Sequence, residues 1–239
     1  MSEFVTLSLR ATFEGQLDVE GAAADRFADR SEREIAALPA RLGARTARLG
    51  DFFDVRGERS TRVRVEGALA QVDGLGAGMA SGELVIDGDA GRRVAAGMTG
   101  GEIVVFGSTG AEAAARVRSG LVVVAGDVGR DAARAMIAGT LVVCGRTGAE
   151  PGRASTRGSI VSLGGIAVPV TYWLACTYKP SHVRLTLKYL HRHYGLAIDE
   201  RVLDGRYRRY CGDAGSPDRG EILEWAPALS SNSANDRRR

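Results

Sequence analysis

The sequence predicts an all-β fold class: a right-handed parallel β-helix of 19-residue coils, with an N-terminal extension and a C-terminal α-helical or irregular extension. Three observations support this prediction. Glycine makes up 32 of the 239 residues, about double its usual share of ~7%, while aromatic residues make up only 6%. Glycines recur every 19 residues in the middle of the chain. Each interval contains a short run rich in valine and isoleucine, which is typical of a β-strand.

Three columns of glycines share one register over successive units. The columns are Gly82, Gly101, Gly120, Gly139 and Gly158; Gly88, Gly107, Gly126, Gly145 and Gly164; and Gly91, Gly110, Gly129 and Gly148. Such self-similarity predicts repeated units that must stack, because one unit cannot bury its own apolar face. Glycine suits the corners between strands, since it adopts positive φ angles without a steric penalty.

One strand is expected in each unit, between the first two glycine columns. The expected strands cover 83–87, 102–106, 121–125, 140–144 and 159–163. Strands separated by one full coil run parallel at about 4.8 Å, and the crossover rule favours a right-handed turn. Val85, Val104 and Val123 should then lie in line on neighbouring strands, within a β-helix that extends over 62–164.

Both faces of these strands are apolar, and successive residues alternate between the faces. One face must fill the interior, so the other points outward and remains apolar. An apolar surface of that extent marks an interaction site unless the chain covers it. The candidate interface residues are Val85, Val104, Val123, Val142, Phe106 and Leu121.

The chain itself offers an element to cover this face. A helix is expected over about 182–194, with Ser181 as its N-terminal cap and Gly195 as its end. Its apolar stripe consists of Val183, Leu187, Leu190 and Tyr194. Coverage by this helix and binding of a partner both remain open, and they can hold on different parts of the face.

The repeats are flanked by three further segments. Residues 1–61 form an N-terminal extension, in which Ser31 and Glu34 fit a capping box that opens a short helix stopped near Pro39. Residues 165–225 form the C-terminal extension. Residues 226–239 are polar and are expected to be a disordered tail.

The C-terminal extension is basic. Between Lys179 and Arg209 there are eight lysines and arginines against three acids. Lys179, Arg184 and Lys188 are therefore candidate contacts for a polyanion, although most such charged faces are simply solvated. The net charge of the whole chain, +3, is too small to predict a nucleic-acid or membrane-surface partner.

Cysteine content and sequence motifs indicate the cellular compartment. The three cysteines are few, widely spaced and lack a CxxC motif, so we expect neither disulfides nor a zinc site. The start of the chain lacks the pattern of a signal peptide. The segment 158–178 is uncharged and long enough to span a membrane, but Gly164, Gly165 and Pro169 interrupt it. We expect a buried segment of a cytoplasmic protein.

The sequence offers little catalytic chemistry. Glu83 and Glu102 occupy the same column on adjacent units, so their carboxyl groups are expected near the ~5 Å separation of retaining glycosidases. Two solvated acids at a strand edge explain the same pattern. We expect no catalytic, cofactor-binding or metal-binding residue in this chain, and we retain a free-standing β-helix enzyme acting on a polyanionic substrate as a rival function.

Five stretches outside the glycine columns carry a family resemblance: EIAALP at 34–39, GDFFD at 50–54, ACTYKP at 175–180, GRYRRY at 205–210 and GEILEW at 220–225. Together they resemble the C subunit of formylmethanofuran dehydrogenase and of its bacterial relative, the formyltransferase/hydrolase complex. The glycine-rich units alone resemble the β-helix domain of glutamate synthase.

This resemblance implies a non-catalytic scaffold subunit of a cytoplasmic hetero-oligomer in one-carbon metabolism. The sister chains would be an amidohydrolase-like subunit with a metal, a formyltransferase subunit and one further subunit. They would move a formyl group between tetrahydromethanopterin and a methanofuran-type carrier and release formate during formaldehyde oxidation. The alternative is the C subunit of a molybdenum or tungsten formylmethanofuran dehydrogenase. The carrier of this family bears a polyglutamate arm, which the basic stretch after Lys179 could contact.

Overall fold

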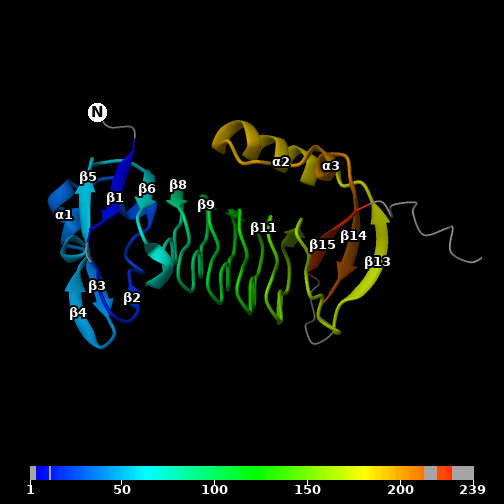
Figure 1. Ribbon diagram of the computed structural model, residues 1–239, viewed down its shortest axis with the longest axis horizontal. Helices are drawn as coiled ribbons and strands as arrows, with labels where there is room; N and C mark the ends of the chain where they lie inside the picture. The colour runs from blue at the N-terminus through cyan, green and yellow to red at the C-terminus, as the bar shows by residue number, and fades with distance from the viewer. Residues whose placement is uncertain (1–3, 11, 213–219, 228–239) are drawn as a thin grey trace, which may run out of the picture.

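The structure is a computed structural model that describes residues 4–10, 12–212 and 220–227. Within these residues the chain forms an eleven-stranded sheet with the order β13-β14-β15-β12-β11-β10-β9-β8-β6-β1-β5, and a four-stranded sheet with the order β4-β3-β2-β7. Figure 1 shows the large sheet running along the molecule, with the N-terminal segments at one end and β13–β15 at the other.

The N-terminal strands are β1 (Val5–Leu9), β2 (Leu17–Asp18), β3 (Pro39–Leu42), β4 (Arg45–Arg48), β5 (Phe53–Arg56), β6 (Arg62–Glu66) and β7 (Val72–Asp73). The strands of the repeats and the C-terminal segment are β8 (Glu83–Asp87), β9 (Glu102–Val105), β10 (Leu121–Val124), β11 (Thr140–Val143), β12 (Ser159–Ser162), β13 (Trp173–Tyr178), β14 (Arg206–Cys211) and β15 (Glu221–Ala226). The α-helices are α1 (Glu32–Ala36), α2 (Ser181–Tyr194) and α3 (Glu200–Leu203). Short 3₁₀ turns are η1 (Ala24–Phe27), η2 (Leu49–Asp51) and η3 (Leu69–Gln71).

The five strands of the repeats pair in the predicted register. Strands β8 to β12 run parallel, and each residue pairs with the residue 19 positions away in the next strand. Val104 accordingly lies between Val85 and Val123, as the glycine spacing predicts. The expected strand positions are confirmed, with bounds that differ by at most one residue.

The predicted fold class, an all-β right-handed parallel β-helix, is wrong. The large sheet is mixed, because β1 pairs antiparallel with β5, and β14 pairs antiparallel with both β13 and β15. The structure also contains helices, of which the longest, α2, packs over the sheet (Figure 1). The prediction confined the β-helix to 62–164 and expected separate extensions on both sides, whereas both flanks add strands to the same sheet.

The segments on both sides of the repeats join the same sheet. Strand β1 pairs in parallel with β6 on one side, and β15 pairs in parallel with β12 on the other. A stack of parallel strands leaves an unpaired edge at each end, and such an edge invites aggregation unless it is paired or covered. The predicted boundaries at 61/62 and 164/165 stay predictions.

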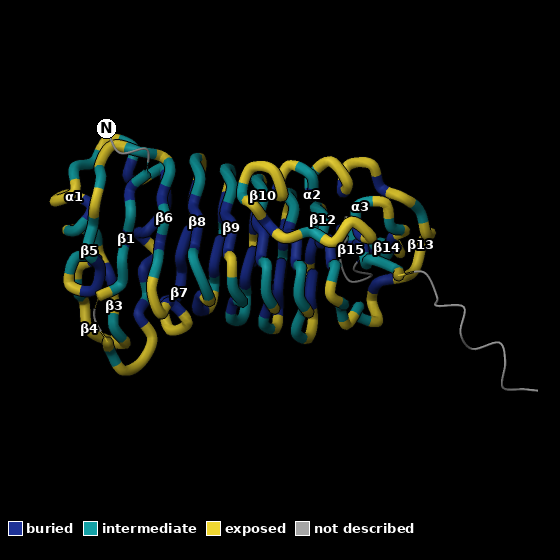
Figure 2. Tube along the Cα trace, turned by 45° about the horizontal axis from the view of Figure 1, so that its top comes forward, coloured by how far each residue is buried: buried dark blue, intermediate teal, exposed yellow. Residues whose placement is uncertain are grey.

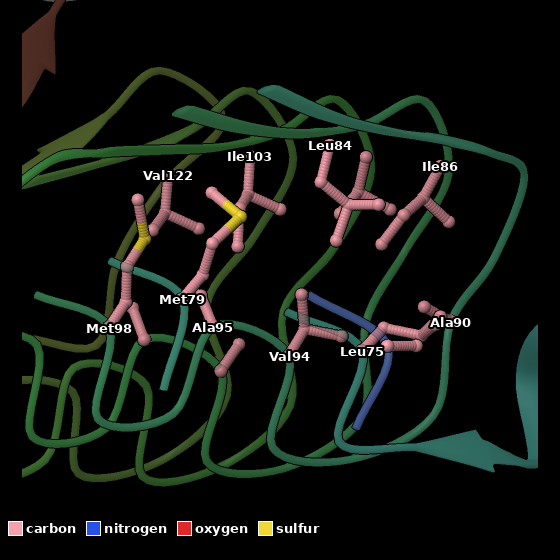
Figure 3. Packing of buried hydrophobic residues seen from close by; sticks show 14 of the residues in the cluster. Leu75, Met79, Leu84, Ile86, Ala90, Val94, Ala95, Met98, Ile103 and Val122 are labelled. Atoms are coloured by element: carbon pink, nitrogen blue, oxygen red, sulfur yellow. The ribbon is translucent and has the colours of Figure 1, made fainter. Parts of the chain in front are cut away.

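The interior of the repeats lies between the sheet and the segments that return beneath it. Figure 3 shows Leu84, Ile103 and Val122 from the strands facing Met79 and Met98 from the returning segments. All five side chains are fully buried. Methionine is suited to this position because its flexible side chain fills irregular gaps between layers. The buried core continues into β1 and β6, where buried residues alternate with partly exposed ones (Figure 2).

Two glycine columns serve different purposes. Gly101 has φ +89°, and a Cβ there would lie 2.6 Å from the carbonyl oxygen of Gly82, so both conformation and space demand glycine. Gly107 and Gly126 have no positive φ, but a Cβ at either would come within 2.4 Å of a side-chain oxygen in the preceding unit. Close stacking, rather than backbone conformation, explains the second column from Gly107 onward, whereas Gly88 at its start has φ +112° and no close contact.

The flanking predictions have several outcomes. Helix α1 begins where expected: the Glu34 carboxylate accepts hydrogen bonds from the Ser31 backbone N–H at 2.8 Å and the Ser31 hydroxyl at 2.7 Å. The uncharged segment 158–178 divides into β12, a connecting loop and β13, and the expectation that it is buried is wrong for β13, which is largely exposed. Among the described residues, no helix has both the length and the apolar composition that crossing a membrane requires. Residues 228–239 of the expected tail lie outside the described residues, whereas β15 extends to Ala226.

Candidate functional site

Helix α2 covers much of the outward face of the repeats. Val104, Val123 and Val142 are at most 1% exposed and form a cluster with Val161 and the helix. The helix contributes the predicted stripe of Val183, Leu187 and Leu190, with Tyr194 half-buried beside them. The chain itself therefore buries the central part of this face.

The ends of α2 are set by local backbone chemistry. Gly195 adopts the left-handed conformation at φ 69°, and its N–H bonds to the carbonyl of His191, which ends the helix as expected. The predicted cap Ser181 is instead the first helical residue, and Pro180 occupies the cap position. Proline resists continuation of a helix on its N-terminal side, because it lacks an N–H donor.

The predicted interface residues fall into two groups. Val85, Val104, Val123 and Val142 are buried within the chain. Phe106 keeps 37% of its surface exposed, and Leu121 is half-buried against the cluster under α2. Contact of this face with another protein stays a prediction. Of the six predicted interface residues, Phe106 has the largest exposed fraction.

The C-terminal turn of α2 is tied to the second repeat by two tyrosines. The hydroxyl groups of Tyr189 and Tyr194 both donate to Oε2 of Glu102, each at 2.7 Å. Burial and the adjacent Glu102 carboxylate raise the pKa of Tyr189 to about 12, and the same causes raise the pKa of Tyr194 further. Both hydroxyls therefore remain protonated donors at neutral pH.

Glu83 and Glu102 pair across β8 and β9, as their shared column predicts. Glu83 accepts a hydrogen bond from Arg62 at 2.9 Å, and His193 lies 3.9 Å from its other oxygen. Because Glu102 holds the two tyrosines, both carboxylates already have structural partners. These contacts hold the C-terminal part of α2 on β8 and β9.

Two of the three predicted polyanion contacts, Lys179 and Arg184, line neighbouring pockets, and polyanion binding stays a prediction. Lys179 follows the end of β13 and lines a pocket of about 470 Å³. Arg184 lines a smaller adjoining pocket of about 80 Å³ with Lys179, and it forms an ion pair with Asp204 at 3.3 Å. Lys188 lies on α2 and lines neither pocket.

Apart from Lys179, the residues that line the larger pocket were not predicted from the sequence. Its lining is Lys179, Arg201, Asp204, Gly205, Arg206, Trp225, Ala226 and Pro227. These residues come from the end of β13, from α3 and its following turn, and from β14 and β15. The run of cations after Lys179 was visible in the sequence, but the pairing of β14 with β15 that brings Arg206 opposite Ala226 was not.

Metal and thiol chemistry find little support in the described residues. Within them, no three His, Cys, Asp or Glu side chains gather closely enough to hold a metal ion. Cys144, Cys176 and Cys211 all lie in the described part of the chain and are free thiols there. Burial raises the pKa of Cys144 to about 11, so this thiol stays protonated and unreactive at neutral pH.

The features above define a class of protein: a chain built on 19-residue β-repeats, extended by strands at both ends and closed by a helix. Over 99 residues, 39% of its length, the chain is 29% identical to the C subunit of molybdenum-containing formylmethanofuran dehydrogenase 1 from Methanosarcina barkeri. The match spans about a third of that relative, 33% of its length. No family model matches the chain.

A solved structure resembles nearly the whole chain. A chain in the crystal structure of the formyltransferase/hydrolase complex from Methylorubrum extorquens, determined with methylofuran, superposes with a TM-score of 0.61 and is 27% identical in sequence. The similarity covers 93% of this chain and 99% of that one. The resemblance to the C subunits of these enzymes, stated from the flanking motifs, is confirmed by both comparisons.

Proposed function

We propose that this chain is a subunit of a cytoplasmic complex of one-carbon metabolism, in which it serves as a non-catalytic scaffold. The complex would be a formyltransferase/hydrolase that moves a formyl group between tetrahydromethanopterin and a methanofuran-type carrier and releases formate. The catalytic metal and the carrier would be bound by the sister subunits: an amidohydrolase-like chain, a formyltransferase chain and one further chain.

One observation carries this proposal: the similarity to a chain of the bacterial complex extends over 93% of this chain and 99% of that one. A match of that extent includes the N-terminal segment and the β13–β15 segment, so it does not rest on the glycine repeats alone. Glu83 and Glu102 were the acids whose spacing suggested catalysis. Their hydrogen bonds to Arg62 and Tyr189 support a structural role instead.

The end of the large sheet offers a surface for a sister subunit. Strand β13 is the outermost strand at this end, and Trp173 and Leu174 are 44% and 55% exposed. Val170, just before the strand, is fully exposed. Exposed apolar side chains along a sheet edge are typical of a surface that another chain covers. We therefore place the expected contact with a sister subunit at β13.

Affinity purification of the tagged chain from cells that naturally contain it tests the assembly. We expect the larger sister subunits to co-purify and to migrate with the chain on gel filtration. Recovery of the chain alone as a monomer, at native expression levels, would contradict the proposal. Formyl transfer and formate release by the purified assembly then test the activity.

A matched pair of variants tests the contact surface. Leu174→Arg places a charge on the exposed edge of β13 and is expected to abolish co-purification. Leu185→Arg changes a leucine on α2 that is 68% exposed, and is expected to leave the assembly intact. If Leu185→Arg alone disrupts the assembly, the sister subunit meets α2 and the assignment to β13 is wrong.

A molybdenum or tungsten dehydrogenase is the second candidate, because the chain also matches the C subunit of the molybdenum enzyme from Methanosarcina barkeri. Metal analysis of the purified assembly separates the two. Zinc-type metal without molybdenum or tungsten supports the formyltransferase/hydrolase, and either heavier metal supports the dehydrogenase. A free-standing enzyme has less support, because the carboxylates that suggested it, Glu83 and Glu102, hold Arg62 and the two tyrosines of α2.

A further inference from the structure

The pocket at the C-terminal end of the sheet contains two cations whose charges are not compensated. Lys179 has no ion-pair partner among the described residues. Arg206 donates one hydrogen bond, to the carbonyl oxygen of Thr177 at 2.9 Å, and pairs with no carboxylate in the same described part of the chain. These two residues lie at neighbouring ends of β13 and β14 and line the same cavity.

The acids nearby are already engaged with other cations. Asp204 lines the pocket but pairs with Arg184 at 3.3 Å. Arg201 also lines the pocket, and the carboxylate of Asp199 accepts from both its side chain and its backbone N–H. The lining of the pocket contains three cations, Lys179, Arg201 and Arg206, and one acid, Asp204, so the local charge is positive. Like charges that line one cavity repel one another, and an anion bound between them relieves this repulsion.

The other wall of the pocket is apolar and anchored. Trp225 lines the cavity together with Ala226 and Pro227, and it also packs against the cluster under α2. The indole edge lies against Gly205, where an added Cβ would come within 2.6 Å of the indole nitrogen. Glycine at this position therefore permits the observed place of the indole. A ring held in this way can stack a flat ligand at little entropic cost.

We propose that this pocket binds a small oxyanion carried on a flat apolar ring, with Lys179 and Arg206 bonding the oxyanion and Trp225 contacting the ring. The cavity volume of about 470 Å³ lies in the range of small-molecule sites. Charged donors form the stronger class of hydrogen bond to carboxylate and phosphate oxygens. An inorganic ion alone would leave the apolar wall against water.

The chain contains two tryptophans, Trp173 and Trp225, so its ¹⁵N-labelled indole groups give two NMR signals. Trp173→Phe assigns them. Titration of the full chain with phenyl phosphate and, separately, with benzoate is expected to shift the Trp225 signal saturably, and the tighter probe identifies the preferred oxyanion. Inorganic phosphate is expected to bind at least tenfold more weakly, because it lacks the ring.

The two lysines give a matched control. Lys179→Gln removes one charged donor and is expected to weaken binding of the aryl anion about tenfold or more. Lys188→Gln removes the same charge outside the pocket and is expected to change binding less than twofold. The proposal is overturned if neither aryl anion shifts the Trp225 signal at millimolar concentration, if inorganic phosphate binds equally well, or if both lysine variants weaken binding equally.

Binding to this pocket does not require sister subunits. Its absence would therefore leave the proposed function intact. Conversely, failure of the chain to co-purify with larger subunits would leave the pocket and its two uncompensated cations in place. The two experiments consequently fail independently.

Discussion

The two faces of strands β9–β12 are buried to the same extent by different means. On the inner face, Ile103 and Leu141 are fully buried against segments that belong to the same run of repeats. On the outer face, Val104 and Val142 are buried by α2, whose first residue lies far downstream at Ser181. Equal burial thus arises once from local stacking and once from a distant segment.

This difference predicts two kinds of stability. The inner face cannot be exposed without separating neighbouring repeats, so its packing is expected to be lost only when the repeats unfold. The outer face can be exposed by release of one helix and the ties at its ends. Elements held by a few contacts open locally at a lower free energy than the global unfolding of the core.

The largest effect is expected from the inner face. Leu141→Ala removes a fully buried side chain from the interior of the repeats and is expected to lower the free energy of unfolding by about 3 kcal/mol. Urea denaturation measures this loss. Leu185→Ala, at an exposed position on α2, serves as the control and is expected to stay within about 0.5 kcal/mol of the parent.

A smaller and more local effect is expected on the outer face. Leu187→Ala also truncates a fully buried leucine, but one that belongs to α2. We expect it to reduce the stability of the docked helix by about 2 kcal/mol. Hydrogen exchange should then show faster exchange of the α2 amides, with little change in β9–β12. Equal loss of protection in the strands would mean that the two faces unfold together.

The smallest effect concerns the tie between α2 and β9. Tyr189→Phe removes one hydrogen bond to Glu102 and is expected to cost about 1 kcal/mol or less at neutral pH. The raised pKa of Tyr189, about 12, means that its contribution is complete below about pH 10 and is lost as pH rises toward 12. Denaturation midpoints of parent and variant should therefore converge over that range. A constant difference up to pH 12 would contradict this assignment.

Repetition explains how much of the fold the sequence could predict. The register of Val85, Val104 and Val123 follows from glycines that recur in every unit, so each unit supports the same strand register independently. The position of α2 follows from its apolar stripe and from Gly195. These signals are local or periodic, and a single sequence displays both directly.

The antiparallel strands could not be predicted in the same way. Strand β13 pairs with β14 across a segment of 27 residues that contains α2 and α3. No sequence repeat in these strands indicates that they pair. The pocket depends on it, because Lys179 and Arg206 meet only when β13 and β14 are neighbours. Contacts between segments that differ in sequence leave no periodic trace, so the basic run alone could not identify Arg206 or Trp225.

Helix α2 also limits how many units the chain can contain. Its first turns lie beside Val142 and Val161 on β11 and β12, while its last turn is bonded to Glu102 on β9. Duplicating the unit that carries Leu121 would move Glu102 away by one strand spacing, about 4.8 Å, or roughly three residues of helix. Tyr194 would then face Leu121, which offers no oxygen to its hydroxyl. The length of α2 therefore matches the number of repeat units that the helix covers.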